Sequence, residues 1–227
     1  MWNGKNKALT FSYDDGVQED KRLVELFNRY GLKGTFNLNS ALLSEELGWN
    51  EWKRGLRVTH VNAAEVPTLY RGHEVAVHTA HHEDLTALPP DTLRKELQED
   101  KAALEALIGG DVVGMAYPYG THNEGVVAAV AAAGLCYART VADTHRFDLP
   151  LTPLTWGHTC HHNDDRLSEL AEAFLALETD TPQLFTVWGH SYEFSVDENW
   201  ERIERFCERM AGRDDIAYVT NREALGL

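Results

Sequence analysis

The chain has 227 residues, of which 43% are hydrophobic and 25% are charged, a composition that is ordinary for one globular domain with a sizeable core. Its 36 acidic and 21 basic residues give a formal net charge of −15. This charge disfavours nucleic acid, anionic membranes and strongly anionic polymers as partners or substrates, because these ligands select for basic patches.

No apolar run approaches the roughly 20 residues that cross a bilayer, and the first seven residues contain no apolar signal core. We therefore expect a soluble, cytoplasmic protein in which residues 1–227 form a single domain. The three cysteines, Cys136, Cys160 and Cys207, lie far apart, which indicates neither a disulfide framework nor a cysteine-based zinc site. The sequence leaves the oligomeric state open.

Strand-like and helix-like segments alternate along the chain, which predicts repeated βα units and a mainly parallel sheet. In chain order we expect a strand at 8–13, a helix at 18–30, strands at 34–38 and 74–77, a helix at 91–107, a strand at 112–117, a helix at 124–133, strands at 136–141 and 154–156, a helix at 166–177, a strand at 184–188, a helix at 198–210 and a strand at 216–219. Gly31 is placed to end the first helix and Asp91 to cap the second. The pattern predicts an α/β fold, a barrel of seven or eight strands with some irregular connections.

Reactive side chains follow four of the predicted strands. The four groups are Asp14-Asp15-Gly16, His78-Thr79-Ala80-His81-His82, Tyr117-Pro118-Tyr119-Gly120 and Gly189-His190-Ser191. In a βα barrel the carboxyl ends of all strands open on one face, where active sites are built. We therefore expect these four groups to meet in one site.

The spacing of His78 and His82 suits a metal site, because two histidines four residues apart lie on one side of a helical turn. A carboxylate from the acidic pair would complete a two-histidine, one-carboxylate set. His81 is a rival for either histidine position. The alternative is that Asp14 and Asp15 only form a turn and that the histidines are structural.

A divalent ion in such a site lowers the pKa of a water and polarises a carbonyl, while a second carboxylate serves as base and a histidine as acid. Asp14 and His190 are the candidates for these two roles. His190 follows an apolar strand and stands between Gly189 and Ser191, where the chain can turn tightly. A structural histidine at the end of a strand is the alternative.

These motifs resemble those of the polysaccharide deacetylases, also called the NodB-homology or carbohydrate esterase family 4 domain. Phe11-Ser12-Tyr13-Asp14-Asp15-Gly16 is similar to the first family motif, and the segment from His78 to His82 is similar to the second. The resemblance implies a distorted (β/α) barrel, Asp14 as general base, and Asp15, His78 and His82 as metal ligands. It also implies that the Tyr119 backbone N–H stabilises the oxyanion and that His190 is the general acid.

The chain departs from the family pattern in its third and fourth motifs. Ala116 stands where the family has an arginine that orients the base, and Arg139, at the end of the next strand, is our candidate replacement. The fourth motif is not recognisable, and the segment from Leu154 to His162 stands in its place. We place Tyr117, Trp156 and His162 among the candidate substrate contacts; His161 and His162 are also candidates for contacting His190, or are structural.

The resemblance implies a metal-dependent hydrolase that removes an N- or O-acetyl group from a carbohydrate and releases acetate. Zinc is the expected ion, with cobalt, nickel or manganese as alternatives. A second possibility is amide or cyclic-ureide hydrolysis on a non-sugar substrate, because the same fold family includes allantoinase-like and imidase-like members. A third possibility is a catalytically silent sugar-binding module.

Overall fold

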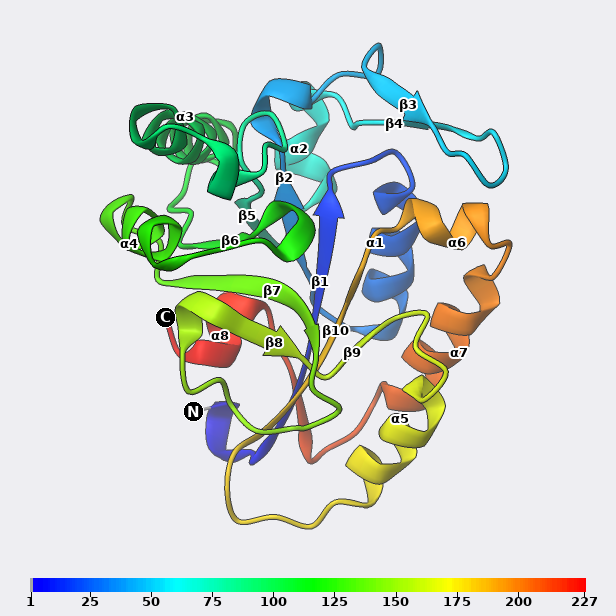
Figure 1. Ribbon diagram of the computed structural model, residues 1–227. Coiled ribbons are helices and arrows are strands. Elements are labelled where there is room, and N and C mark those ends of the chain that lie inside the picture. The colour runs from blue at the N-terminus through cyan, green and yellow to red at the C-terminus, as the bar shows by residue number, and fades with distance from the viewer. Residues whose placement is uncertain (1) are drawn as a thin grey trace.

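A computed structural model describes residues 2–227 as parallel strands surrounded by helices (Figure 1). The strands are β1 (Lys7–Asp15), β2 (Thr35–Leu38), β5 (Glu74–Val77), β6 (Gly114–Ala116), β7 (Tyr137–Asp143), β8 (Trp156–His158), β9 (Cys160–His161), β10 (Gln183–Gly189) and β11 (Ile216–Tyr218). Within the described residues they form one sheet in the order β8-β7-β6-β5-β2-β1-β10-β9, and β11 pairs with β1. The predicted α/β class with a mainly parallel sheet is confirmed.

One short segment joins the two edges of this sheet. β8 pairs with β7, and β9 pairs with β10 on the other side. Only Thr159 separates β8 from β9, and its backbone N–H donates to the carbonyl of Thr186 in β10. The sheet therefore closes into a distorted barrel, in which β8 and β9 share one strand position.

Strand β1 is paired along both of its edges. β10 follows one edge from Lys7 to Tyr13, while β11 and β2 divide the other, at Lys7–Leu9 and Ser12–Asp15 respectively. The central position of β1 places Asp14 and Asp15 at the mouth of the barrel.

The helices cover the outside of the sheet (Figure 1). They are α1 (Asp20–Tyr30), α2 (Val66–Leu69), α3 (Pro90–Ile108), α4 (Glu124–Ala132), α5 (Leu167–Ala176), α6 (Tyr192–Val196), α7 (Trp200–Met210) and α8 (Asn221–Leu225). α1 buries Leu23 and Phe27 against Phe11 and ends at Gly31, which has a φ of 67° as predicted for a helix C-cap. No helix in the described part of the chain has the length and hydropathy needed to cross a bilayer.

The side chains of β1 alternate between two environments, as those of a strand must. Leu9, Phe11 and Tyr13 belong to the apolar core between sheet and helices. Ser12 and Asp14 are also buried, but they contact polar groups from β2 and β7. Of these β1 side chains, those that point into the barrel are therefore polar, and those that point toward the helices are apolar.

Three details of the predicted elements are wrong. Asp91 does not cap α3, because the helix begins at Pro90 and the Asp91 side chain contacts Arg94 within its first turn. The strand expected at 154–156 is a 3₁₀ turn at Pro153–Thr155 followed by β8, because the N–H of Thr155 donates to the carbonyl of Thr152 and closes a turn. The strand expected at 112–117 is shortened to β6.

Residues 40–72, for which no helix or strand is predicted, contain a small antiparallel hairpin. Its strands are β3 (Gly48–Asn50) and β4 (Arg57–Thr59). In Figure 1 the hairpin lies at the end of the molecule toward which β1 points. It therefore stands beside the barrel mouth.

Candidate active site

A cavity of about 440 Å³ opens where the strands of the barrel end. It is lined by Asp14, Asp15, Asn39, Leu42, Trp49, His60, His78, His82, Tyr117, Tyr119, Val141, Trp188, His190 and Tyr192. All four reactive groups of the sequence contribute to this lining. Their predicted convergence at the carboxyl ends of the strands is confirmed.

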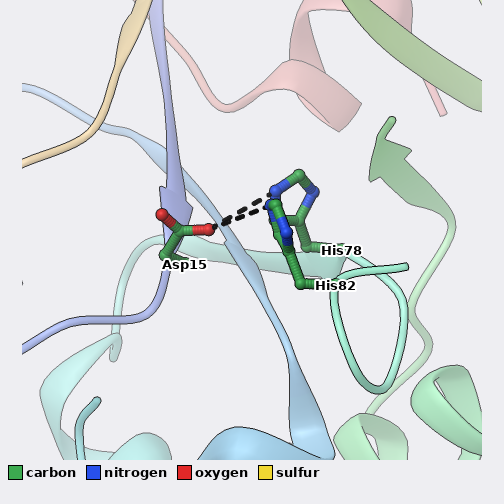
Figure 2. A group of neighbouring side chains, drawn as sticks. All are labelled: Asp15, His78 and His82. Atoms are coloured by element: carbon green, nitrogen blue, oxygen red, sulfur yellow. Dashed lines mark ion pairs between the residues drawn. The ribbon is translucent and has the colours of Figure 1, made fainter. Parts of the chain in front are cut away.

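Asp15, His78 and His82 bring three potential ligand atoms together (Figure 2). The Oδ1 atom of Asp15 lies 3.6 Å from Nε2 of His78 and 3.6 Å from Nε2 of His82. These distances exceed a hydrogen bond, and they are slightly longer than the roughly 3.4 Å between two atoms that bind one tetrahedral zinc ion. The donor set and its spacing therefore fit one divalent ion.

The neighbours of His78 prepare its imidazole for a ligand role. Its Nδ1 atom donates to the carbonyl of Ala116 at 2.9 Å, which leaves the Nε2 lone pair facing Asp15. Burial lowers the pKa of His78 to about 3, so the ring is neutral at physiological pH. The backbone N–H of His78 is held by the buried carboxylate of Asp100 on α3, at 3.0 Å.

The carboxylate of Asp15 is kept ionised by the histidines around it. Burial raises the pKa of this group, but His190, His78 and His82 together hold it below its ordinary value. An ionised carboxylate beside two imidazoles is the charge arrangement that a divalent cation requires.

The backbone around the triad is strained, which corrects the predicted helical turn at 78–82. Thr79 and His82 have positive φ values of 64° and 58°, so the loop rather than a helix brings the two imidazoles together. Asp15 and Tyr119 also have positive φ values, of 77° and 58°. Such conformations cost roughly 1–3 kcal/mol each and gather at functional sites.

His81 does not compete for the triad. Its Nδ1 atom lies 2.8 Å from Glu96 Oε1, and its backbone N–H donates to the same side chain at 3.0 Å. The loop thus turns His78 and His82 toward Asp15, and His81 toward α3.

Asp14 is buried at the centre of a polar cluster inside the barrel. Its Oδ1 atom forms an ion pair with Arg139 from β7 and accepts a hydrogen bond from Asn37 Nδ2 at 2.9 Å. The Arg139 side chain is fully buried, and its guanidinium lies 5.1 Å from the centre of the Trp188 ring. Arg139 therefore reaches the carboxylate that the missing arginine of the third motif would contact.

His190 approaches the other carboxylate oxygen of Asp14. Its Nε2 atom lies 3.8 Å from Asp14 Oδ2, and Nε2 of His78 lies 3.9 Å from the same oxygen. Burial lowers the pKa of His190, but Glu193 and Asp15 outweigh it, so the pKa is raised above its ordinary value. Asp14 thus lies beside both the triad and a readily protonated imidazole.

Two predicted substrate contacts are wrong. Trp156 is buried at 2% exposure, where it packs on Tyr137 and His158 away from the cavity. His162 has no exposed surface and stacks on Tyr13. The third, Tyr117, lines the cavity and donates its hydroxyl to the carbonyl of Leu154.

The sequence interpretation missed other cavity walls and one charged group. Trp188, Tyr192 and His60 line the cavity. Trp49 also lines it, and its long, aromatic segment is of a kind that suits a substrate loop. Glu193, three residues after His190, contacts its ring. Residues three apart at the start of a helix lie on the same side of it, so this spacing could have indicated from the sequence that Glu193 contacts His190.

With this geometry in place, comparison with known proteins identifies the class. The family model described as polysaccharide deacetylase matches residues 3–138. The match covers more than half of the chain, and the chain therefore belongs to the polysaccharide deacetylase family. The matched part contains Asp14, the triad and Tyr119, and it ends one residue before Arg139.

One curated relative is a gellan lyase from a Bacillus species, which is 28% identical over 131 residues. The match covers 56% of this chain but 5% of the relative. The lyase name therefore describes a far larger protein.

Solved structures share the fold at low sequence identity. A structure described as a polysaccharide deacetylase from Mycobacterium smegmatis has a TM-score of 0.70 at 18% identity, covering 98% of this chain and 90% of the other. A family 4 carbohydrate esterase from Streptomyces lividans, in complex with acetate, has a TM-score of 0.58 at 18% identity, with coverage of 94% and 91%. A family 4 pseudoenzyme from Bacillus anthracis has a TM-score of 0.60 at 17% identity, with coverage of 97% and 66%. The shared fold therefore does not itself establish activity.

Proposed function

We propose that this chain is a metal-dependent deacetylase that hydrolyses an N- or O-acetyl group on a carbohydrate and releases acetate. The observation that carries the proposal is the position of Asp14. Its carboxylate is paired with Arg139 and lies within 3.9 Å of both His78 and His190. A silent binding module needs no such buried carboxylate between a candidate ligand and a candidate acid.

In this proposal Asp15, His78 and His82 hold one divalent ion, with zinc as the expected ion and cobalt, nickel or manganese as alternatives. When bound, the ion would polarise the acetyl carbonyl and lower the pKa of a water molecule. The chain itself prepares these ligands, since Ala116 fixes the tautomer of His78 and the Tyr119 hydroxyl lies 3.2 Å from Nδ1 of His82.

Asp14 acts as the general base and accepts a proton from the attacking water. Arg139 and Asn37 orient its carboxylate by occupying Oδ1, which leaves Oδ2 facing His78 and His190. The Tyr119 backbone N–H donates to the oxygen on which negative charge develops.

His190 acts as the general acid. It gives a proton from Nε2 to the departing nitrogen or oxygen, which keeps the electron pair of the broken bond to the acetyl carbon. Water supplies the new oxygen of acetate, and its proton on Asp14 balances the one that His190 gives away. One acetyl group and one water thus become acetate and a free amine or hydroxyl group.

The substrate in this proposal is an acetylated sugar or oligosaccharide that binds over the cavity. Trp49, Trp188, Tyr119 and Tyr192 supply aromatic surface around the reacting groups, which suits a sugar ring with apolar faces and polar edges. We further propose that residues 1–227 act as one catalytic domain.

The test is acetate release from a panel of N-acetylated chito-oligosaccharides, O-acetylated xylo-oligosaccharides and small cyclic ureides, together with elemental analysis of the purified protein. We expect about one zinc-class ion per chain, acetate release from at least one saccharide, and loss of activity with a chelator. Turnover of a cyclic ureide but of no saccharide would favour an amide or cyclic-ureide hydrolase instead.

His78→Ala and His81→Ala form a matched pair within one loop. His78→Ala is expected to lose the ion and the activity, while His81→Ala keeps both, because its ring faces Glu96. Activity that is indifferent to the chelator and to His78→Ala would refute the proposal.

A further inference from the structure

One carboxylate on the far side of His190 contacts three imidazoles. Oε2 of Glu193 lies 3.0 Å from Nε2 of His161 and 3.0 Å from Nε2 of His162. Oε1 of the same residue lies 3.4 Å from Nδ1 of His190. We call these four residues the Glu193 cluster.

The proton on the His161 ring can be placed from its neighbours. Nδ1 of His161 accepts the backbone N–H of Asn163 at 3.1 Å, so in the neutral ring Nε2 carries the proton. That proton faces the carboxylate of Glu193. His161 therefore presents an N–H to Glu193 at an ion-pair distance of 3.0 Å, without the angles of a hydrogen bond.

His162 lies 3.0 Å from the same carboxylate oxygen, in a fixed position. Its ring is fully buried, stacks on Tyr13 with 5.6 Å between ring centres, and lies 4.1 Å from the ring centre of Phe194. A Cβ atom on Gly189 would lie 2.1 Å from its Nδ1 atom. The backbone just before His190 is thus packed directly against this ring.

The contact with Glu193 also favours one tautomer of His190. Nδ1 of His190 lies 3.4 Å from Oε1 of Glu193 and has no hydrogen-bond partner among the described residues, and a carboxylate only accepts hydrogen bonds, so this contact favours a proton on Nδ1. Nε2 is then the nitrogen that exchanges its proton with the cavity, where Asp14 lies 3.8 Å away. Although burial raises the pKa of Glu193, the three histidines lower it far below its ordinary value, so the carboxylate stays charged.

We propose that Glu193 is the positioning residue for the acid: it holds Nδ1 of His190 so that Nε2 delivers the proton to the leaving group, and His161 and His162 hold Glu193. This inference rests on the proposed deacetylase function. In the proton transfer, the N–H bond at Nε2 breaks, a bond to the departing nitrogen or oxygen forms, and the charge left on the imidazolium falls to zero. Glu193 stays ionised throughout and takes no proton.

The main rival is a second cation site, because ligand atoms of His161, His190 and Glu193 lie within 4.8 Å of one another. The proton on Nε2 of His161 opposes that reading, since a metal needs the free lone pair at that atom. Zinc titration decides between them. We expect one bound zinc per chain in both the unmodified protein and Glu193→Gln, and a second zinc that disappears in Glu193→Gln would overturn the proposal.

The kinetic test compares two leaving groups in the zinc-loaded protein. p-Nitrophenolate leaves without a proton, whereas the amine or hydroxyl group of a saccharide needs one. For Glu193→Gln we expect kcat on the best acetylated oligosaccharide to fall about 100-fold with little change in KM. Hydrolysis of p-nitrophenyl acetate should change by less than about threefold, and Glu193→Asp should recover part of the loss.

Glu201→Gln, which removes an exposed carboxylate at the start of α7, is the matched control and should leave both activities unchanged. Equal losses on the two substrates would show that Glu193 only supports the fold, and no loss on either would show that it does not position the acid. Each result contradicts the proposal.

A measurement without turnover separates this inference from the proposed function. An unmodified protein that cleaves p-nitrophenyl acetate but no saccharide would refute the proposed substrate class alone. Nitrogen-15 spectra of the neutral histidine rings then still test Glu193. We expect the His190 proton on Nδ1 in the unmodified protein and a mixture of tautomers in Glu193→Gln; a proton on Nε2 in the unmodified protein would overturn the assignment.

Discussion

The guanidinium of Arg139 and the carboxylate of Asp14 form an ion pair whose two side chains are 0% and 3% exposed. The residues lie on β7 and β1, which are not neighbours in the sheet, so the contact crosses the barrel interior. The pair thus joins two sides of the fold at the residue that we propose as the base.

Arg139→Met should leave the Asp14 carboxylate buried without its cation. Removing one partner of a buried ion pair costs about 3–5 kcal/mol of folding free energy, and a misplaced base should lower kcat about 100-fold. Urea unfolding and acetate release measure the two effects.

Arg209→Met provides the comparison, because Arg209 pairs with Glu172 at the surface and should change neither quantity measurably. Acetate release that is undiminished in Arg139→Met would remove Arg139 from the proposed site.

Asp15→Asn and Asp14→Asn distinguish ligand from base. Zinc at 100 times its Kd should stabilise the metal-free protein by about 2.7 kcal/mol, which raises Tm by roughly 5–10 °C for a chain of this size. Asp15→Asn should lose most of this rise. Asp14→Asn should keep most of the zinc-dependent rise in Tm but lose turnover. Calorimetric scans with and without zinc measure this rise; a rise that is lost in Asp14→Asn and kept in Asp15→Asn would show that the two roles are exchanged.

Gly189→Ala should disturb the Glu193 cluster. The added Cβ would lie 2.1 Å from Nδ1 of His162, and overpacking of this kind costs about 1–3 kcal/mol. We expect lower stability and a lower kcat on acetylated oligosaccharide. Gly110→Ala has no atom within 4 Å of its new Cβ and serves as the control; equal behaviour of the two variants in thermal unfolding would contradict the packing argument.

Asp20 should make the folding stability depend on pH. Burial raises its pKa to about 7, while Ser191 and Tyr70 donate to its two oxygens and lower it. Because the unfolded carboxyl loses its proton near pH 4, the stability that Asp20 contributes is full below that pH and is lost as pH rises to about 7.

Asp20→Asn removes this titration. Between pH 5 and 7, the free energy of unfolding of the variant should therefore rise relative to that of the unmodified protein by about 1.4 kcal/mol per pH unit. Urea unfolding at three pH values measures the difference between the two proteins, in which other titrating groups cancel. A difference that stays constant with pH would show that Asp20 is ionised throughout.

The sequence predicted the strands and the four reactive groups because buried parallel strands are apolar runs and active residues follow their ends. It also predicted the contact of Arg139 with Asp14, since the missing arginine had to be replaced from a nearby strand end. It failed for Trp156 and His162, whose directions depend on how residues 156–161 close the barrel. The strained loop at 78–82 was equally hidden, because nothing in Thr79 or His82 signals a positive φ.

The residues proposed to hold the ion and activate water come from a different stretch of chain than those proposed to supply the acid. Asp14, Asp15, His78 and His82 come from the first 82 residues, whereas His161, His190 and Glu193 come from the last 70 or so. Between the two groups, Nε2 of His190 lies 3.8 Å from Oδ2 of Asp14. Under the proposed function, a change in the later stretch can therefore spare the hydrolysis of substrates with good leaving groups and impair that of substrates with poor ones. The two parts of the reaction can thus be altered separately within one barrel.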